Sequence, residues 1–255
     1  MWSRAELKER ALNVLRAHRW AAVAVCFIWS IASGGSGGFS SSYNNGGGNS
    51  NSNPFISTNN TQMEVDWSNP VVKAAFITAI IVGIIGIVFA LFVTGPLEVG
   101  VQKFFISARE DDADMKHLGF GFTNNYLGNV GKIFLRSLYI FLWSLLFCIP
   151  GIIKAYEYRM VPYILADNPD LTSKQAFGLS KKMMDGEKWN TFILDLSFIP
   201  WYLLSIPTCM ILAMFHVMPY QLCTNAELYD VLREKVVSSD VEAAQLLGYQ
   251  KEEVI

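Results

Sequence analysis

The stretch Ile149–Ala166, with the sequence IPGIIKAYEYRMVPYILA, decides how the rest of the chain is interpreted. It follows an apolar run and opens with the Pro150-Gly151 break. Its charged residues are Lys154, Glu157 and Arg159. If Pro150-Gly151 is a turn between two membrane helices, the chain folds as helical hairpins. If residues 152–166 are only a loop, every later segment lies on the opposite side of the membrane.

The composition is typical of a membrane protein. Hydrophobic residues make up 52% of the 255 residues and charged residues only 16%, whereas ordinary soluble domains carry roughly 25% charged residues. Because the net charge is −2 and no basic patch is interleaved with aromatics, we expect no nucleic-acid partner. The cysteines lie in apolar runs without the spacing of a metal site or a disulfide framework. They are Cys26, Cys148, Cys209 and Cys223.

The N-terminal part predicts an amphipathic helix that runs into a membrane span. Ser3 and Glu6 have the spacing of a capping box, and the apolar residues from Leu7 to Leu15 share one helix face. The apolar run from Trp20 to Ala32 is short for a bilayer. It spans only if the helix begins near Leu12 and the intervening arginines snorkel to the headgroups. A cleaved signal peptide is the competing interpretation.

Residues 33–70 are rich in Gly, Ser and Asn and predict a flexible loop, because they cannot bury enough apolar surface to offset their ordering entropy. No Lys or Arg occurs between Arg19 and Lys73. The positive-inside rule therefore places this loop on the outer side. Val71–Thr94, which follows, is the clearest predicted span.

Three proline motifs indicate an internal repeat. Each reads proline, large apolar, any residue, aliphatic, small, and each closes an apolar region; they begin at Pro96, Pro162-Tyr163 and Pro219-Tyr220. The intervals from Pro150 to Pro162 and from Pro207 to Pro219 are both twelve residues. The sequence therefore predicts an all-α fold, a polytopic membrane helical bundle of three helical hairpins with six spans. Four spans are the alternative.

The charge distribution favours six spans. Four spans would put the basic stretch 154–188 outside, whereas six spans put the N-terminus, residues 97–132, residues 167–190 and the C-terminus inside. The later hairpin helices then have only about 15–17 apolar residues, at or below the usual length. We expect residues 1–235 to form one membrane domain and residues 236–255 to be a mobile tail.

A second amphipathic segment repeats the N-terminal design. Thr172 and Gln175 can cap a helix, lysines line its polar face, and Trp189 follows. Basic amphipathic helices of this kind would lie on an anionic inner leaflet. Membrane lipids are therefore the expected partners, while a protein partner or a homo-oligomer stays open.

Ionisable residues also fall within the predicted spans. They are Arg136, Lys154, Glu157, Arg159, Asp195 and His216. Such groups usually face the bundle interior, pair, and often mark a pathway. Lys154 and Glu157 can pair on one helix face, and Asp195 could pair with Arg136 or Arg159. The alternatives are ion pairs that fix packing, snorkelling, or a substrate or proton path; His216 is expected to be a packed polar contact.

No nucleophile-elbow, zinc-protease, P-loop or dinucleotide motif occurs, so we expect no enzyme activity, catalytic residue, metal or cofactor. Long stretches carry a family resemblance: Met1–Leu12, Gly95–Gly100, Trp143–Pro169, Trp189–Tyr202, and the end from Pro219 to Tyr229. With these the chain resembles a bacterial family of integral membrane proteins, domain of unknown function 975. The resemblance covers nearly the whole chain except residues 34–70 and the tail. It implies a bacterial plasma membrane and brings no activity with it.

Two classes of function remain. The first is a non-enzymatic membrane scaffold or interaction protein, with both termini cytoplasmic. The second is a small permease or channel-like protein that uses Arg136, Glu157, Arg159 and Asp195 along a polar path. The absence of a deep, central charge cluster in the sequence favours the first.

Overall fold

The computed structural model describes residues 2–33, 69–146, 148–208 and 211–247. Every regular element in these ranges is helical, so the predicted all-α class is confirmed. Most of the predicted outer loop, residues 34–68, lies outside the described residues. So does the end of the predicted tail, residues 248–255.

The N-terminal amphipathic helix packs on protein. α1 (Arg4–Ala17) begins at Ser3, whose Oγ accepts a hydrogen bond from the Glu6 N–H at 3.2 Å. α2 (Arg19–Ala32) follows after a bend of 97°. The apolar residues of α1 are buried, and the helix contacts α12 (Met218–Ser239). Its apolar face is therefore filled by protein, which corrects the expectation that this face lies on the inner leaflet.

One helix of 39 residues runs from α3 (Pro70–Phe89) through the π-helical turn η1 (Ala90–Thr94) to the end of α4 (Gly95–Ala108). The sequence predicts a helix exit at the first proline motif, and this is wrong, because the helix continues beyond it. Proline disrupts the bond to the carbonyl four residues earlier. Here that carbonyl, of Phe92, accepts a hydrogen bond from the Tyr126 hydroxyl at 2.8 Å.

The next helices form a hairpin. After η2 (Met115–Gly119) and α5 (Phe120–Thr123), α6 (Tyr126–Leu146) packs against α7 (Cys148–Glu157). The predicted turn at Pro150-Gly151 is misplaced, since α7 already contains both residues. Pro150 is tolerated there because the first helical turn does not need its N–H. Gly151 lies against Ser144 so closely that an added Cβ would be 2.7 Å from its Cα.

The rest of the chain consists mainly of short helices. They are α8 (Val161–Asp167), α9 (Ser173–Met183), α10 (Lys188–Leu196), α11 (Ile199–Ser205), the π-helical turn η3 (Ala213–Val217), α12 and α13 (Val241–Leu246). The predicted capping box at Thr172 and Gln175 is present. The predicted span 191–206 is wrong as one helix: α10 ends at Leu196, and α11 starts afresh around Pro200.

The helices that start at the proline motifs build the core. Pro96, Pro162 and Pro219 are buried and stand in the first turns of α4, α8 and α12. α4 contacts both α8 and α12, and the Tyr163 ring of α8 stacks on Tyr229 of α12 at 5.4 Å. The small residue that ends each motif is buried in all three helices.

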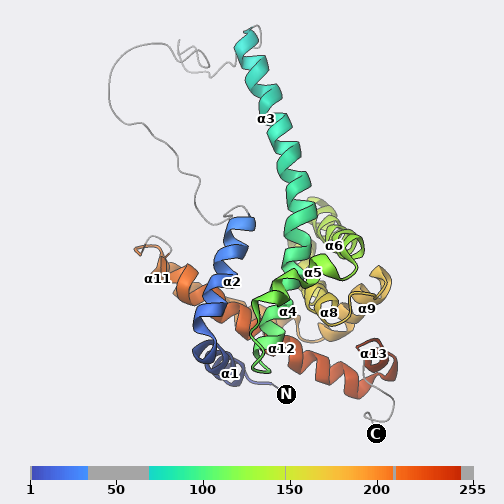
Figure 1. Ribbon diagram of the computed structural model, residues 1–255. Coiled ribbons are helices and arrows are strands. Elements are labelled where there is room, and N and C mark those ends of the chain that lie inside the picture. The colour runs from blue at the N-terminus through green and yellow to red at the C-terminus, as the bar shows by residue number, and fades with distance from the viewer. Residues whose placement is uncertain (1, 34–68, 147, 209–210, 248–255) are drawn as a thin grey trace.

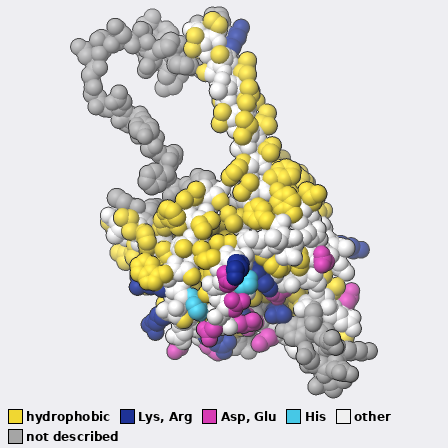
Figure 2. All heavy atoms as spheres, viewed as in Figure 1, with side chains coloured by type: hydrophobic (Ala, Val, Ile, Leu, Met, Phe, Trp, Pro, Cys, Tyr) yellow, Lys and Arg dark blue, Asp and Glu magenta, His cyan; other side chains and the backbone are white. Residues whose placement is uncertain are grey.

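The molecule has two tiers. We call α1, α4, α8, α9, α12 and α13 the base; Figure 1 shows α3 projecting away from it, with α2 rising in the same general direction. We call α2, α3, α11, η3 and the α6–α7 hairpin the apolar tier. Large hydrophobic side chains are exposed all over it, for example those of Phe27, Ile84, Leu145, Ile149 and Leu203. In Figure 2 hydrophobic atoms cover the upper part of the view, and most charged side chains gather below.

Within the described residues, two helices are long and apolar enough to cross a membrane, Pro70–Ala108 and Tyr126–Leu146. The number is up to three if the bent α1–α2 pair counts as one span. The predicted six spans are not confirmed. The reason is length: α7 has 10 residues, α10 has 9 and α11 has 7.

The predicted domain boundary at residue 236 falls inside α12, which continues to Ser239. α13 follows, with Ala243 and Ala244 buried. The Asn168 side-chain amide donates to the Leu246 carbonyl at 2.9 Å, which ties α13 to the end of α8. Residues 236–247 therefore pack as part of the base.

Candidate functional site

A polar network lies where the apolar tier meets the base, and its centre is the pair of Arg159 and Asp195. Arg159 stands in the turn between α7 and α8, and its guanidinium donates to both carboxylate oxygens of Asp195, from Nη2 at 2.9 Å and from Nη1. The Tyr156 hydroxyl donates to the same carboxylate at 2.8 Å. Arg159 Nη2 also donates to Asn225 Oδ1 of α12 at 2.8 Å. Bidentate pairing of this kind fixes geometry as well as charge.

Glu157, two residues before Arg159, is a second centre. Its carboxylate accepts from Lys154 Nζ at 2.9 Å, as the three-residue spacing predicts, and from Lys188 Nζ at 3.2 Å. Lys181 Nζ lies 4.0 Å away. The Glu157 side chain is only 5% exposed. The Ser180 hydroxyl donates to the Glu157 carbonyl at 2.7 Å, so α7 is bound to α9 as well as to α10.

Arg136 pairs elsewhere. Its Nη1 donates to Glu98 Oε1 at 2.8 Å, which joins α6 to α4. Of the two partners that the sequence suggests for Asp195, the structure therefore selects Arg159. Each charged candidate residue from the sequence is in an ion pair.

His216 packs between aromatic rings, as expected of a packed polar contact. Its ring centroid lies 6.0 Å from that of Trp201 and 6.1 Å from that of Tyr220. It also lines a cavity of about 520 Å³ beside Arg19 at the start of α2. The repeat-motif tyrosines have packing contacts too, since the Tyr220 ring meets Phe198 edge to face at 5.3 Å.

The sequence interpretation missed Glu187, which joins the N-terminus to α12. Its carboxylate accepts from Trp2 Nε1 at 3.2 Å, Asn190 Nδ2 at 3.0 Å and Lys235 Nζ at 2.7 Å. Burial raises the pKa of Glu187, but these hydrogen bonds outweigh it and hold the pKa below its usual value. The partners come from distant parts of the chain, so no local sequence signal could have identified this cluster.

Arg109 was missed in the same way. At the end of α4 it donates to Glu227 Oε1 at 2.8 Å and to Asp230 Oδ2 at 2.6 Å, both on α12. Burial lowers the pKa of Arg109, but the two carboxylates outweigh burial and raise it. This cluster fixes α4 to α12 inside the base.

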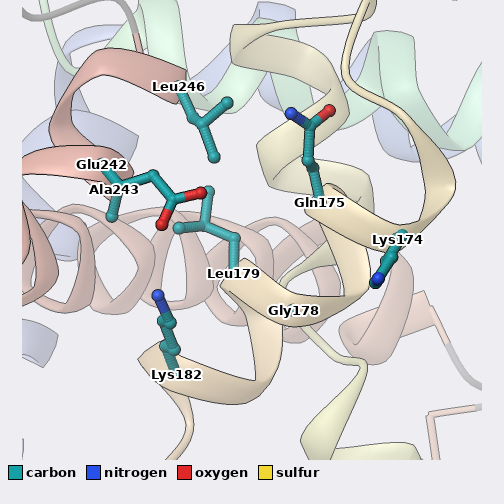
Figure 3. A pocket seen from close by; sticks show the side chains of 8 residues that line it. All are labelled: Lys174, Gln175, Gly178, Leu179, Lys182, Glu242, Ala243 and Leu246. Atoms are coloured by element: carbon teal, nitrogen blue, oxygen red, sulfur yellow. The ribbon is translucent and has the colours of Figure 1, made fainter.

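A cavity of about 320 Å³ lies between α9 and α13 (Figure 3). Leu179 and Leu246 face each other across it, and Gln175, Lys182 and Glu242 stand around its edge. Lys182 Nζ is held by Asp240 Oδ2 at 2.6 Å. The lining holds no hydroxyl, thiol or imidazole, so these side chains provide no nucleophile–base pair of the Ser–His type. In the described part of the chain, no three His, Cys, Asp or Glu side chains come together as metal ligands would.

A family profile described as "Protein of unknown function (DUF975)" matches residues 55–236, which include the Arg159–Asp195 network and all three proline-motif helices. The match leaves out α1 and α2, although α1 packs on α12 in the base. No curated protein and no solved structure matches the chain. The chain belongs to the DUF975 family of proteins of unknown function.

Proposed function

We propose that this protein is a multi-pass protein of a bacterial plasma membrane that acts as a non-enzymatic scaffold or interaction protein. The apolar tier supports the membrane location, because large hydrophobic side chains stay exposed on α2, α3 and the hairpins. In a bilayer these side chains face lipid instead of water. Two helices of sufficient length and hydropathy agree with this location.

The distribution of charge supports the orientation. No Lys or Arg occurs between Arg19, at the start of α2, and Lys73, near the start of α3. The base carries the basic helices α1 and α9 and the C-terminal helices. By the positive-inside rule α2 and α3 cross the membrane on either side of an outer segment, and the base with both termini is cytoplasmic.

Six spans would place the same segments inside, but they need two long helices in each later hairpin. The short helices between residues 148 and 205 do not provide that length. We therefore propose two crossings, by α3 and, in a locally thinned bilayer, by the 14 residues of α2. Basic side chains of the base, such as Lys174 on α9, are then the candidates for contact with anionic headgroups.

The observation that carries the scaffold proposal is that the charged candidates neutralise one another. Arg159, Asp195 and Asn225 join the α7–α8 turn to α10 and α12. Charges in such pairs stabilise one helix arrangement. A permease of the alternative kind would need them to face a path and exchange partners.

A charge-removal series separates these two functions. In a strain that lacks the gene, the double variant Arg159→Gln, Asp195→Asn keeps hydrogen-bonding groups and removes both charges. A scaffold predicts that this variant restores the deletion phenotype at normal protein level and retains whatever protein or lipid copurifies in mild detergent. If it accumulates normally, keeps its copurified material and yet fails to restore the phenotype, the charges act in a pathway and the scaffold proposal is wrong.

A further inference from the structure

The length of α7 limits how far the α6–α7 hairpin reaches from the base. α7 has 10 residues and is therefore about 15 Å long, half of a hydrocarbon core of about 30 Å. Its last residue, Glu157, is already bound to α9 through Ser180. The return arm of this hairpin thus covers one leaflet and no more.

The outgoing arm has the same reach, although α6 itself is longer. The first half of α6 belongs to the base level: Asn129 and Lys132 are buried, and Lys132 Nζ donates to the Pro169 carbonyl at 2.5 Å. Leu127 and Phe134 are exposed singly, and a dense run of exposed hydrophobic residues extends from Leu138 to Leu146, which is again about 13 Å of helix. The two arms end together at a tip near Ile149.

The depth of the α11–η3 hairpin follows from its position beside α2. Thr208 and Ile211, close to its tip, line the same cavity as Arg19. Arg19 is the first residue of α2, at the end where this helix meets α1. A hairpin that crossed the bilayer would bring its tip to the other end of α2, near Ala32, about 20 Å away. The tip therefore lies at the depth of the inner end of α2.

The surfaces of both hairpins fit hydrocarbon. No Asp, Glu, Lys or Arg occurs in residues 138–153 or in residues 196–215. Ile149 is 73% exposed, and Leu203 is 65% exposed. Lys154 and Lys188 stand where the hairpins leave the base, and Arg19 lies beside the α11–η3 hairpin. Cations at that level match the phosphate groups of the inner leaflet.

We propose that the α6–α7 and α11–η3 hairpins insert into the inner leaflet alone. The α6–α7 hairpin ends near the bilayer midplane, and the α11–η3 hairpin lies shallower, near the inner end of α2. The hairpins contact the acyl chains of that leaflet, and the basic side chains where they leave the base contact phosphate headgroups. The chain then crosses the membrane twice and enters one leaflet twice more. This inference rests on the membrane location and orientation proposed above.

Cysteine accessibility in the full-length protein tests the proposal. The background carries Cys148→Ser and Cys209→Ser and keeps Cys26 and Cys223, which are buried. Single cysteines then replace Ile149 and Ile206 in the hairpins. Asn69→Cys serves as the outer control and Lys174→Cys as the inner control. A membrane-impermeant maleimide is added to intact cells and, separately, to inverted vesicles.

From either side of the membrane, the hairpin cysteines should react at least about tenfold more slowly than the accessible control, because a thiol in hydrocarbon does not ionise. They should react fully in denaturing detergent. Nitroxides at the same sites should be more accessible to oxygen than to a polar nickel complex, with a depth near the midplane at position 149 and a shallower depth at position 206. The nitroxide measurement also applies to Leu203→Cys, if Ile206→Cys accumulates poorly.

Three results would overturn the inference in distinguishable ways. Reaction of the hairpin cysteines from outside, as fast as Asn69→Cys, means that the hairpins span the membrane. Reaction from inside, as fast as Lys174→Cys, means that they lie outside the hydrocarbon. If Asn69→Cys reacts from inside and Lys174→Cys reacts from outside, the proposed orientation fails, and the inference loses its basis with it.

Discussion

The indole N–H of Trp2 donates a hydrogen bond to the carboxylate of Glu187 at 3.2 Å, across 185 residues of sequence. The same carboxylate holds Lys235 of α12. One half-buried acid thus connects Trp2, the start of α10 and α12. The base is closed by contacts of this kind, which have no counterpart in local sequence patterns.

Glu187→Ala should therefore destabilise the base. The side chain is 13% exposed, and its loss leaves Trp2 and Asn190 without their acceptor. Fully buried groups left unsatisfied cost about 1–3 kcal/mol each, and the cost is lower here because both side chains are only half-buried. Thermal unfolding in mild detergent should show a clearly lower midpoint than for the matched variant Glu242→Ala, an exposed acid on α13. Equal midpoints would show that the cluster contributes nothing to stability.

The same acid makes stability depend on pH. The pKa of Glu187 is lower in the folded protein than its usual value of 4.5. The folded state therefore binds fewer protons, and the stabilisation is present above the unfolded pKa and lost as pH falls through the folded pKa. The thermal unfolding midpoint should decrease as the pH is lowered below 4.5. The decrease should be less steep in Lys235→Met, because this variant lacks a main cause of the lowered Glu187 pKa. If the unfolding midpoint depends on pH equally steeply in both proteins, Glu187 is not the source of this pH dependence.

Gly151→Ala should open the α6–α7 hairpin. The added Cβ would lie 2.7 Å from Ser144 Cα, and backbone cannot move aside as a flexible side chain does. Overpacking of this kind costs roughly 1–3 kcal/mol. Gly131→Ala on α6 is the matched control, since nothing lies within 4 Å of its added Cβ. Detergent unfolding of both variants checks this; if Gly151→Ala is as stable as Gly131→Ala, the helices do not pack this closely.

Removing one partner of the Arg159–Asp195 pair should destabilise the protein more than removing both. Each single change to a neutral side chain leaves a poorly solvated charge, which costs about 3–5 kcal/mol for a fully buried pair and less here, because the side chains are 17% and 23% exposed. A double-mutant cycle with Arg159→Gln and Asp195→Asn, followed by protein level and unfolding, should show positive coupling. Additive losses would mean that the two residues act separately.

Tyr126→Phe should weaken the helix at the first proline motif. Its hydroxyl supplies the Phe92 carbonyl with a donor, and such a bond contributes about 0.5–1.5 kcal/mol. Tyr139→Phe is the control, because its ring contacts with Tyr158 and Phe177 remain. Hydrogen exchange of the amides around η1 should speed up in Tyr126→Phe alone; faster exchange in neither variant would contradict this role.

The sequence predicts the helices better than their arrangement. Periodicity and capping residues identify α1 and α9, and hydropathy identifies α3. Proline does not identify helix ends, because Pro96 and Pro150 lie inside helices. Pro96 is accommodated by a π-helical turn and a distant tyrosine hydroxyl, and neither feature is visible in a pattern of residue types. Hydropathy also cannot tell a surface that faces lipid from one that faces protein, so it leaves the partner of α1 undetermined.

For the candidate residues too, the sequence predicts contacts within one helix but not contacts that depend on how helices pack. The spacing of Lys154 and Glu157 predicts their pair, since both stand on one helix. The partner of Asp195 stays ambiguous in the sequence, because it depends on how α7, α10 and α12 pack. Glu98, which pairs with Arg136, lies in a segment that the sequence assigns to a connection. Its place inside a proline motif is the signal that could have found it.

The packing of α1 on α12 sets an order of assembly. α1 leaves the ribosome before α12, the helix whose surface covers Leu7 and Leu15. α2 and α3 can therefore insert before the base has assembled, and the apolar face of α1 stays uncovered until then. Contacts so distant in sequence form late and slowly. Closure of the base between α1 and α12 can take place only once α12 has been made.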